Sequence, residues 1–270
     1  MISAKKLLAE NEALRQELGA LRERVDALEK ANPLFGKKYY ACGDSFTQGD
    51  FSGFTDESGL TKEESPVIFD KEWNMYKTYP WWIGRRNHMT VINEARRGST
   101  IALDKDYVAG VPGVARDHLR PFILDRYLQI PEDTDYCTIW FGINDSAHTL
   151  LGEPDDVTPE TYYGAWNIVL EWILTNRPYM KLGIIVTNDA APEWREATRT
   201  AAKRWGVPYL DMTGDPSVPL IINREESLGC CEKAQELRKS VFYVTKENDH
   251  PNLRAHEYQS YFIEEFMRRL

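Results

Sequence analysis

A serine that follows a short apolar run is the first residue of this sequence suited to covalent chemistry. Residues 39–42 are β-formers and are followed by Gly43, Asp44 and Ser45, so a strand would deliver Ser45 to a tight turn. A helix that begins after such a turn points its N-terminal amides back at the hydroxyl. A hydroxyl is a weak nucleophile at neutral pH, so this chemistry also requires a histidine base, a group that orients the base, and donors for an oxyanion.

Three later segments supply candidates for these roles. The segments cover residues 93–100, 142–145 and 247–252. They contain Gly98, Asn144 and His250, in that order after Ser45. A Gly-Asp-Ser tripeptide alone is expected by chance in roughly one chain in ten of this length. Together, however, the four segments resemble the SGNH (GDSL-type) hydrolase family, which is named for a Ser, Gly, Asn and His in separate blocks. The resemblance extends from about Lys37 to the C-terminus.

The resemblance implies a role for each of these residues. Ser45 would be the nucleophile, and His250 would remove its proton. The oxyanion donors would be the Ser45 amide, the Gly98 amide and the Asn144 side chain, and a glycine lets the backbone approach closely. We predict no metal site and no cofactor, because the sequence has no paired-cysteine or His-Glu-x-x-His spacing.

The acid that orients His250 is the main departure from the family pattern. Family members usually carry an aspartate three residues before the histidine, where this chain has Glu247, and Asp249 is adjacent to His250. We predict Glu247 as the acid, because its carboxylate can fold back to Nδ1 of the imidazole. Asp249 is the alternative, although neighbouring side chains in an extended segment diverge. Asp44 and Asp145 are predicted to support loop amides and not to transfer protons.

Alternating strands and helices are expected to position these residues. Apolar runs predict strands over residues 39–42, 90–93, 136–141, 182–186 and 208–211. Helices are predicted over residues 79–87, over residues 192–205 and from Asn252 to Leu270. A further helix is predicted to begin at a cap formed by Thr158-Pro159. Such alternation implies a parallel sheet, and the resemblance implies the flavodoxin-like, three-layer α/β/α fold of SGNH hydrolases. Ser45, Gly98 and Asn144 would then lie at the carboxyl ends of the first three strands, where open α/β sheets place their sites.

A long insertion follows the serine turn. Residues 51–77 mix Gly, Ser and acidic residues with five aromatic residues. We interpret the insertion either as a lid or pocket wall, or as a loop that its aromatic side chains hold against the body.

The first thirty residues carry a heptad pattern. Position d holds Leu7, Leu14, Leu21 and Leu28, and position a holds Ala4, Asn11, Leu18 and Val25. In a parallel pair the g and e′ residues would be Glu10 with Arg15, Glu17 with Arg22, and Arg24 with Glu29, all of opposite charge. We therefore predict a parallel dimeric or trimeric coiled coil through residues 4–28, so that residues 1–31 form a stalk and residues 32–270 the hydrolase domain. The alternative is a single amphipathic helix that lies on the globular domain.

The amino-acid composition narrows the classes of protein to which this chain can belong. With 270 residues, 42% of them hydrophobic, the chain can bury one substantial core. Its net charge of −9 does not favour nucleic acid as a partner. No apolar run approaches about 18 residues and the first thirty residues are highly charged, so we predict neither a membrane span nor a signal peptide. We expect synthesis in the cytoplasm, and association with a virion or phage tail stays open.

These observations favour a serine esterase that works through an acyl-enzyme. A carbohydrate O-acetyl ester is the first candidate substrate, because members of the resembled family often deacetylate sugars and an oligomeric stalk suits a multivalent polymer. One alternative is a carbohydrate-binding or structural head of a phage tail or surface protein, with incidental turnover. Another is a lysophospholipase or thioesterase, whose acyl chains the apolar residues of the insertion would accommodate. The presence of all four signature residues favours catalysis.

Overall fold

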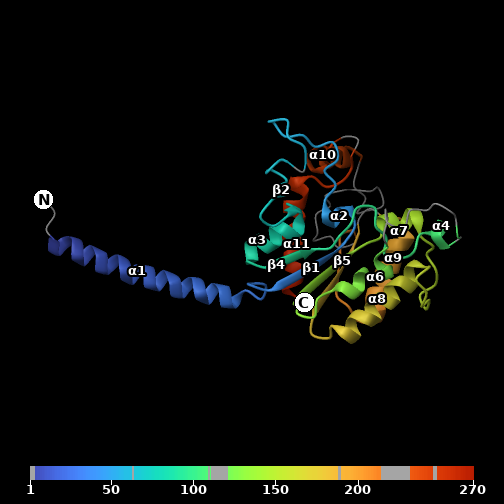
Figure 1. The fold of residues 1–270 in the computed structure, drawn as a ribbon, viewed down its shortest axis with the longest axis horizontal. Helices are drawn as coiled ribbons and strands as arrows, with labels where there is room; N and C mark the ends of the chain where they lie inside the picture. Colours follow the sequence, from blue (N-terminus) through green and yellow to red (C-terminus); the bar gives the residue numbers. More distant parts are fainter. Residues whose placement is uncertain are drawn as a thin grey trace.

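A parallel sheet covered by helices on both faces forms the body of the protein, and one long helix projects from it (Figure 1). The computed structural model describes residues 4–62, 64–108, 110, 121–187, 190–213, 232–245 and 248–270. Within these residues no helix has the length and apolar character that crossing a bilayer requires. The predicted α/β fold class is confirmed.

The main sheet has five strands. They are β1 (Lys38–Gly43), β4 (Thr90–Asn93), β5 (Tyr136–Trp140), β6 (Lys181–Val186) and β7 (Tyr209–Asp211). Their order is β4-β1-β5-β6-β7, and all neighbours run parallel. Counted along the sheet strands in chain order, this is the 2-1-3-4-5 order of the flavodoxin-like fold. The interior position of β1, between β4 and β5, fits its continuous apolar run, since both of its faces are covered.

Side chains that alternate along β1 enter two separate cores. Tyr40 and Cys42 pack with α6 (Phe122–Asp125), α8 (Tyr162–Asn176) and α9 (Pro192–Trp205). Tyr39 and Ala41 pack with α3 (Tyr79–Asn87) and α11 (Leu253–Arg268) on the opposite face. This alternation is the two-residue period of a strand, and it produces the three predicted layers.

Shorter elements complete the body. They are α2 (Ser45–Gln48), β2 (Phe69–Asp70), β3 (Met75–Tyr76), α4 (Lys105–Val108), the 3-10 helix η1 (Arg126–Gln129), α7 (Ile143–His148) and α10 (Glu232–Phe242). Strands β2 and β3 form an antiparallel hairpin within the insertion. The predicted cap at Thr158 is wrong, because α8 begins after Thr161, whose hydroxyl accepts a hydrogen bond from the Gly164 amide at 3.2 Å. The Asp156 carboxylate accepts a hydrogen bond from the Thr161 hydroxyl at 2.8 Å and so fixes the hydroxyl at this cap.

Helix α1 (Ala4–Ala31) extends away from the body (Figure 1). The apolar side chains described at its a and d positions are between 44% and 71% exposed. These are Leu14, Leu18, Leu21, Val25 and Leu28. The heptad face is therefore not buried against the globular domain of the same chain.

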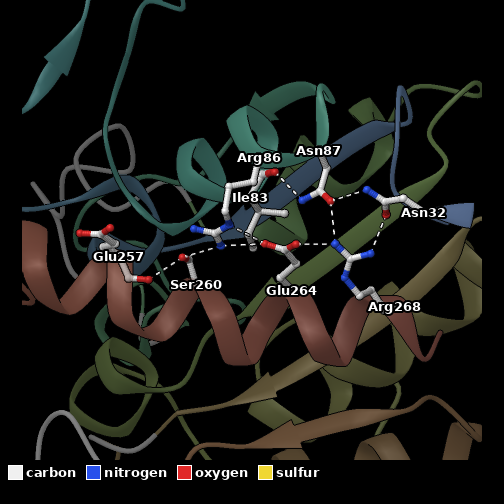
Figure 2. Close-up of polar contacts among 8 residues, drawn as sticks. All are labelled: Asn32, Ile83, Arg86, Asn87, Glu257, Ser260, Glu264 and Arg268. Atoms are coloured by element: carbon white, nitrogen blue, oxygen red, sulfur yellow. Dashed lines mark hydrogen bonds and ion pairs between the residues drawn. The ribbon is translucent and has the colours of Figure 1, made fainter. Parts of the chain in front are cut away.

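A polar cluster fixes the point where α1 joins the body. Figure 2 shows Arg268 of α11 reaching between Asn32 and Asn87, and its guanidinium donates to their side-chain oxygens at 2.6 and 2.8 Å. Arg268 also pairs with Glu264 at 2.6 Å, and Glu264 accepts from Arg86 of α3 at 2.8 Å. Burial opposes ionisation of Glu264, but these hydrogen bonds hold the pKa of its carboxyl below the usual range. The end of α1 is thereby tied to both α3 and α11.

This junction lies at the end of the sheet opposite the serine turn. Residues 32–37 connect α1 to the start of β1 at Lys38, and Ser45 follows the other end of the same strand. Five steps of about 3.3 Å separate Lys38 from Gly43, or about 16 Å. Helix α1 therefore leaves the body on the side away from Ser45.

Candidate active site

The turn that presents Ser45 depends on a glycine and an aspartate. A Cβ on Gly43 would lie 2.9 Å from the Trp140 carbonyl oxygen and would also collide with Thr47, so only glycine fits here. The Asp44 carboxylate accepts a hydrogen bond from the Phe46 amide at 2.9 Å and caps α2. The chain therefore turns sharply between β1 and α2, with Ser45 as the first residue of the helix.

His250 lies next to Ser45 although 205 positions separate the two residues. Its Nε2 atom is 2.8 Å from the Ser45 hydroxyl oxygen. The imidazole packs against the Phe46 ring at 5.5 Å between centroids, and the His250 carbonyl accepts from the Val244 amide at 3.0 Å. The 2.8 Å between Nε2 and the Ser45 hydroxyl oxygen is within the reach of a general base that takes the hydroxyl proton.

The loop that carries Gly98 is bonded to the serine turn. The Arg96 amide donates to the Gly43 carbonyl at 3.0 Å, and the Arg97 amide donates to the Gln48 side chain at 2.8 Å. Gly98 has φ of +71°, a left-handed conformation that favours glycine. The backbone of this loop is thus held beside α2.

Asn144 joins the same loop from α7, directly after β5. Its side-chain nitrogen donates to the Ser99 carbonyl at 3.0 Å. A side-chain amide has two N–H donors, so one is left for a further acceptor. The structure therefore brings Asn144 and the Gly98 loop to the end of the sheet where Ser45 and His250 meet.

Arg126 is a buried residue of this region that the sequence analysis did not single out. Its side chain has no exposed surface, and its ion-pair partner Glu94 is 9% exposed. The guanidinium also donates to the Ser99 hydroxyl and, at 3.4 Å, to the Gly43 carbonyl. Arg126 thus ties the Gly98 loop to the ends of β1 and β4. No motif marks this arginine, and an isolated charged residue is usually exposed.

Asp145 supports a second part of the loop. Its carboxyl accepts hydrogen bonds from the Ile101 amide at 3.0 Å and the Ala102 amide at 3.2 Å. Burial, with a further contribution from Asp44, raises the pKa of Asp145 to about 8 against the effect of these amides. Burial therefore favours the neutral form of this carboxyl, which anchors the backbone through the hydrogen bonds that it accepts.

Among the described residues, the partner of the His250 Nδ1 atom is a side-chain amide. Glu247 lies outside the described residues. Asp249 is 70% exposed, and its nearer oxygen is 3.9 Å from Nδ1. The side-chain oxygen of Asn248 lies 2.7 Å from Nδ1. The sequence-based expectation is a carboxylate, Glu247 or Asp249. Asparagine is a common turn residue, however, because its side-chain oxygen can accept a hydrogen bond from the backbone amide two residues later.

Three of the other histidines are placed elsewhere. His88 ends α3 in a left-handed conformation, and His148 is half exposed with Nδ1 3.7 Å from Asp104. His256 is buried and bonded to Gln259 at 3.0 Å; burial, with a contribution from His250, lowers the pKa of His256 to about 3. In the described part of the chain, no group of three or more His, Cys, Asp or Glu residues could hold a metal ion.

Comparison with known proteins gives a family match and several similar folds. The model of the GDSL-like lipase/acylhydrolase family matches residues 41–257. No curated protein matches. A solved structure from Lactobacillus plantarum is 19% identical with a TM-score of 0.60, over 87% of this chain and 98% of that chain.

Two further structures extend this comparison. A protein from Bacteroides ovatus, assigned by name to the GDSL-like lipases, is 16% identical with a TM-score of 0.55, over 87% of this chain and all of that chain. A carbohydrate esterase is 11% identical with a TM-score of 0.51, over 89% of this chain and 70% of that chain. At these identities the likeness concerns the fold.

Proposed function

The chain belongs to the GDSL-like lipase/acylhydrolase family, and on this premise we propose that it is a serine ester hydrolase that works through an acyl-enzyme. The observation that carries the proposal is the 2.8 Å contact between the Ser45 hydroxyl and Nε2 of His250. It unites a nucleophile and a base, the minimum that serine-based acyl transfer requires.

In the proposed reaction His250 Nε2 accepts the Ser45 proton while the hydroxyl oxygen attacks the acyl carbon. The Ser45 and Gly98 amides and the free N–H of Asn144 stabilise the oxyanion that forms. When the intermediate collapses, the C–O bond to the alcohol breaks and His250 returns the proton to the departing oxygen. Water then attacks the acyl-enzyme with the same assistance, which releases the acid and restores Ser45.

The proposed substrate is an O-acetylated carbohydrate. A hollow of about 950 Å³ lies between α10 and residues 243–245; Asp249, which precedes His250 in the chain, is part of its wall, whereas Ser45 and His250 are not. Its described polar lining consists of Glu236, Lys239, Ser240, Tyr243, Thr245 and Asp249. Charged and hydroxyl side chains can bind the hydroxyl groups of a sugar, whereas a long acyl chain requires apolar walls. The similarity in fold to a carbohydrate esterase supports the same substrate class.

A panel of chromogenic esters with acyl chains of graded length tests this function. We expect hydrolysis of the acetyl ester and a loss of about tenfold or more in kcat/KM from acetyl to butyryl, because in an enzyme selective for acetyl groups each added methylene on the acyl chain lowers kcat/KM. Release of acetate from an acetylated oligosaccharide should follow. Fastest turnover of an octanoyl ester would instead indicate a lysophospholipase or thioesterase, and no turnover of any ester would indicate a binding head.

We further propose that α1 associates with α1 of other copies of this chain as a parallel coiled coil. Its a and d side chains are exposed in the single chain, and the g and e′ residues are of opposite charge in the parallel register. The cluster around Arg268 holds the end of α1 against the body. Parallel helices would therefore present two or three heads together, with each Ser45 on the side away from the stalk.

Deletion of residues 1–31 is expected to give a folded, active monomer. The deletion removes the exposed heptad face and retains Asn32, which bonds to Arg268 and Asn87. Light scattering should give the mass of one chain for the truncated protein and two or three times the chain mass for the full protein. An unchanged oligomer after the deletion would show that the heads associate by themselves.

A further inference from the structure

We propose that Asn248, and not a carboxylate, is the residue that positions the catalytic imidazole of His250; this inference rests on the proposed function. The Asn248 side-chain oxygen is 2.7 Å from Nδ1 of His250 and also accepts the His250 backbone amide at 3.1 Å. The two contacts fix the ring relative to its own backbone. They leave Nε2 pointing at the Ser45 hydroxyl.

The orientation of the Asn248 amide follows from its other contacts. Its nitrogen lies 2.8 Å from the Ser52 carbonyl oxygen and 3.3 Å from the Asp50 carbonyl oxygen. Carbonyl oxygens only accept, so the amide nitrogen must face them and the amide oxygen must face His250. An accepting oxygen at Nδ1 requires that Nδ1 carries the proton. Nε2 is then left unprotonated, as a base for Ser45 must be.

The same contacts connect the base to the start of the insertion. Asp50 and Ser52 follow α2 directly, and the Asp50 carboxylate holds the turn through the Ser52 amide at 2.9 Å and Arg97 at 3.2 Å. The backbone N–H of Asn248 donates to the Thr245 hydroxyl at 3.1 Å. Asn248 is therefore fixed by backbone and side-chain bonds, so its oxygen is preorganised for Nδ1.

An amide supplies orientation without a net charge. Among the described residues, the charged groups near His250 are Asp249, with an oxygen 3.9 Å from Nδ1, and Asp50. Burial opposes ionisation of Asp50, but hydrogen bonds from Ser52 and the charges of His250 and Arg97 hold its pKa below the usual value. His256 is buried and neutral. Asn248 therefore sets the tautomer of His250, whereas Asp249 and Asp50 supply the negative charge near it.

Two substitutions of Asn248 separate the orientation of the imidazole from the effect of a charge beside it. Asn248→Ala removes the acceptor, and we expect kcat to fall by about 10² to 10³-fold with KM changed by less than about threefold. Asn248→Asp keeps an acceptor and adds a charge. We expect its kcat to stay within about tenfold of the wild type and the acidic limb of its pH–rate profile to move to higher pH, because a carboxylate favours the imidazolium form.

Matched variants identify the residue responsible. Asn176→Ala, at an exposed asparagine of α8 that donates to the Trp172 carbonyl, should leave kcat within about twofold of the wild type. Glu247→Gln and Asp249→Asn should each lose less activity than Asn248→Ala. The proposal is overturned if Asn248→Ala keeps more than about a tenth of the wild-type kcat, or if Glu247→Gln is the more damaging change.

The tautomer itself can be measured without turnover. Nitrogen NMR of ¹⁵N-histidine-labelled full-length protein, with His250 assigned by its substitution, should show the Nδ1–H form in the wild type and a loss of this form in Asn248→Ala. An Nε2–H form in the wild type at neutral pH would overturn the proposal. If the NMR result holds and no ester is hydrolysed, the proposed function fails while the positioning role of Asn248 stands.

Discussion

Replacement of Ser45 by alanine is expected to lower the hydrolysis of the acetyl ester by on the order of 10⁶-fold, because the acyl-enzyme then has no oxygen through which to form. The hydroxyl bonds to His250, and loss of one such bond costs about 1 kcal/mol of folding free energy. Steady-state kinetics on purified protein, with thermal unfolding measured in parallel, checks both expectations.

A serine outside the site provides the matched control. Ser58 is exposed in the insertion and bonds to Asp56 at 2.6 Å, so Ser58→Ala should retain activity within about twofold. If Ser45→Ala retained more than about a thousandth of the wild-type rate, Ser45 would not be the nucleophile.

The sheet could be predicted because its strands carry a strong local signal. β1 and β5 are buried on both faces, so their apolar runs mark them directly, and each run ends in a glycine and polar residues. The family pattern then supplied Gly98, Asn144 and His250 as partners of Ser45. The 2.8 Å contact between Ser45 and His250 joins segments from opposite ends of the domain, a closeness that no local pattern in the sequence contains.

The partner of Nδ1 was harder to predict because it depends on how one short loop folds. A carboxylate is the usual group in a serine triad, which is why Glu247 and Asp249 are the predicted candidates. Glu247 lies outside the described residues, so its role stays a prediction. The side-chain oxygen of Asn248 faces Nδ1 because its side-chain nitrogen bonds to the carbonyls of Asp50 and Ser52. These two residues lie almost two hundred positions earlier in the chain. Helix α10 was missed for a different reason: most of its residues are charged or polar, and Leu237 and Val241 are exposed.

The ion pair of Arg126 could likewise not be predicted from the sequence. Its partner Glu94 lies 32 positions earlier, and no spacing or motif in the sequence links the two residues. Only the fold brings the two side chains together beneath the Gly98 loop, where the guanidinium bonds to Ser99 and to the end of β1. The cluster therefore connects the stability of the sheet edge with the placement of an oxyanion donor.

Replacement of Arg126 by methionine should consequently lower the free energy of unfolding by about 3 to 5 kcal/mol, because the Glu94 carboxylate would be left buried without its ion-pair partner. The Gly98 loop would also lose its bond from Arg126 to Ser99. Since a misplaced oxyanion donor costs about 10²-fold or more in kcat, we expect a loss of turnover at temperatures where the variant is still folded. Urea unfolding and steady-state kinetics measure the two effects.

Two further variants distinguish the effect of leaving the Glu94 charge buried without Arg126 from the effect of removing any arginine. Arg204 pairs with Asp155 at the surface, and both side chains are exposed, so Arg204→Met should change stability by less than about 1 kcal/mol. The double variant Arg126→Met with Glu94→Leu removes both buried charges and should regain part of the lost stability, while its turnover stays low because Ser99 still lacks the guanidinium. A stability loss of under about 1 kcal/mol in Arg126→Met would show that Glu94 finds other donors, and that the loop does not depend on this arginine.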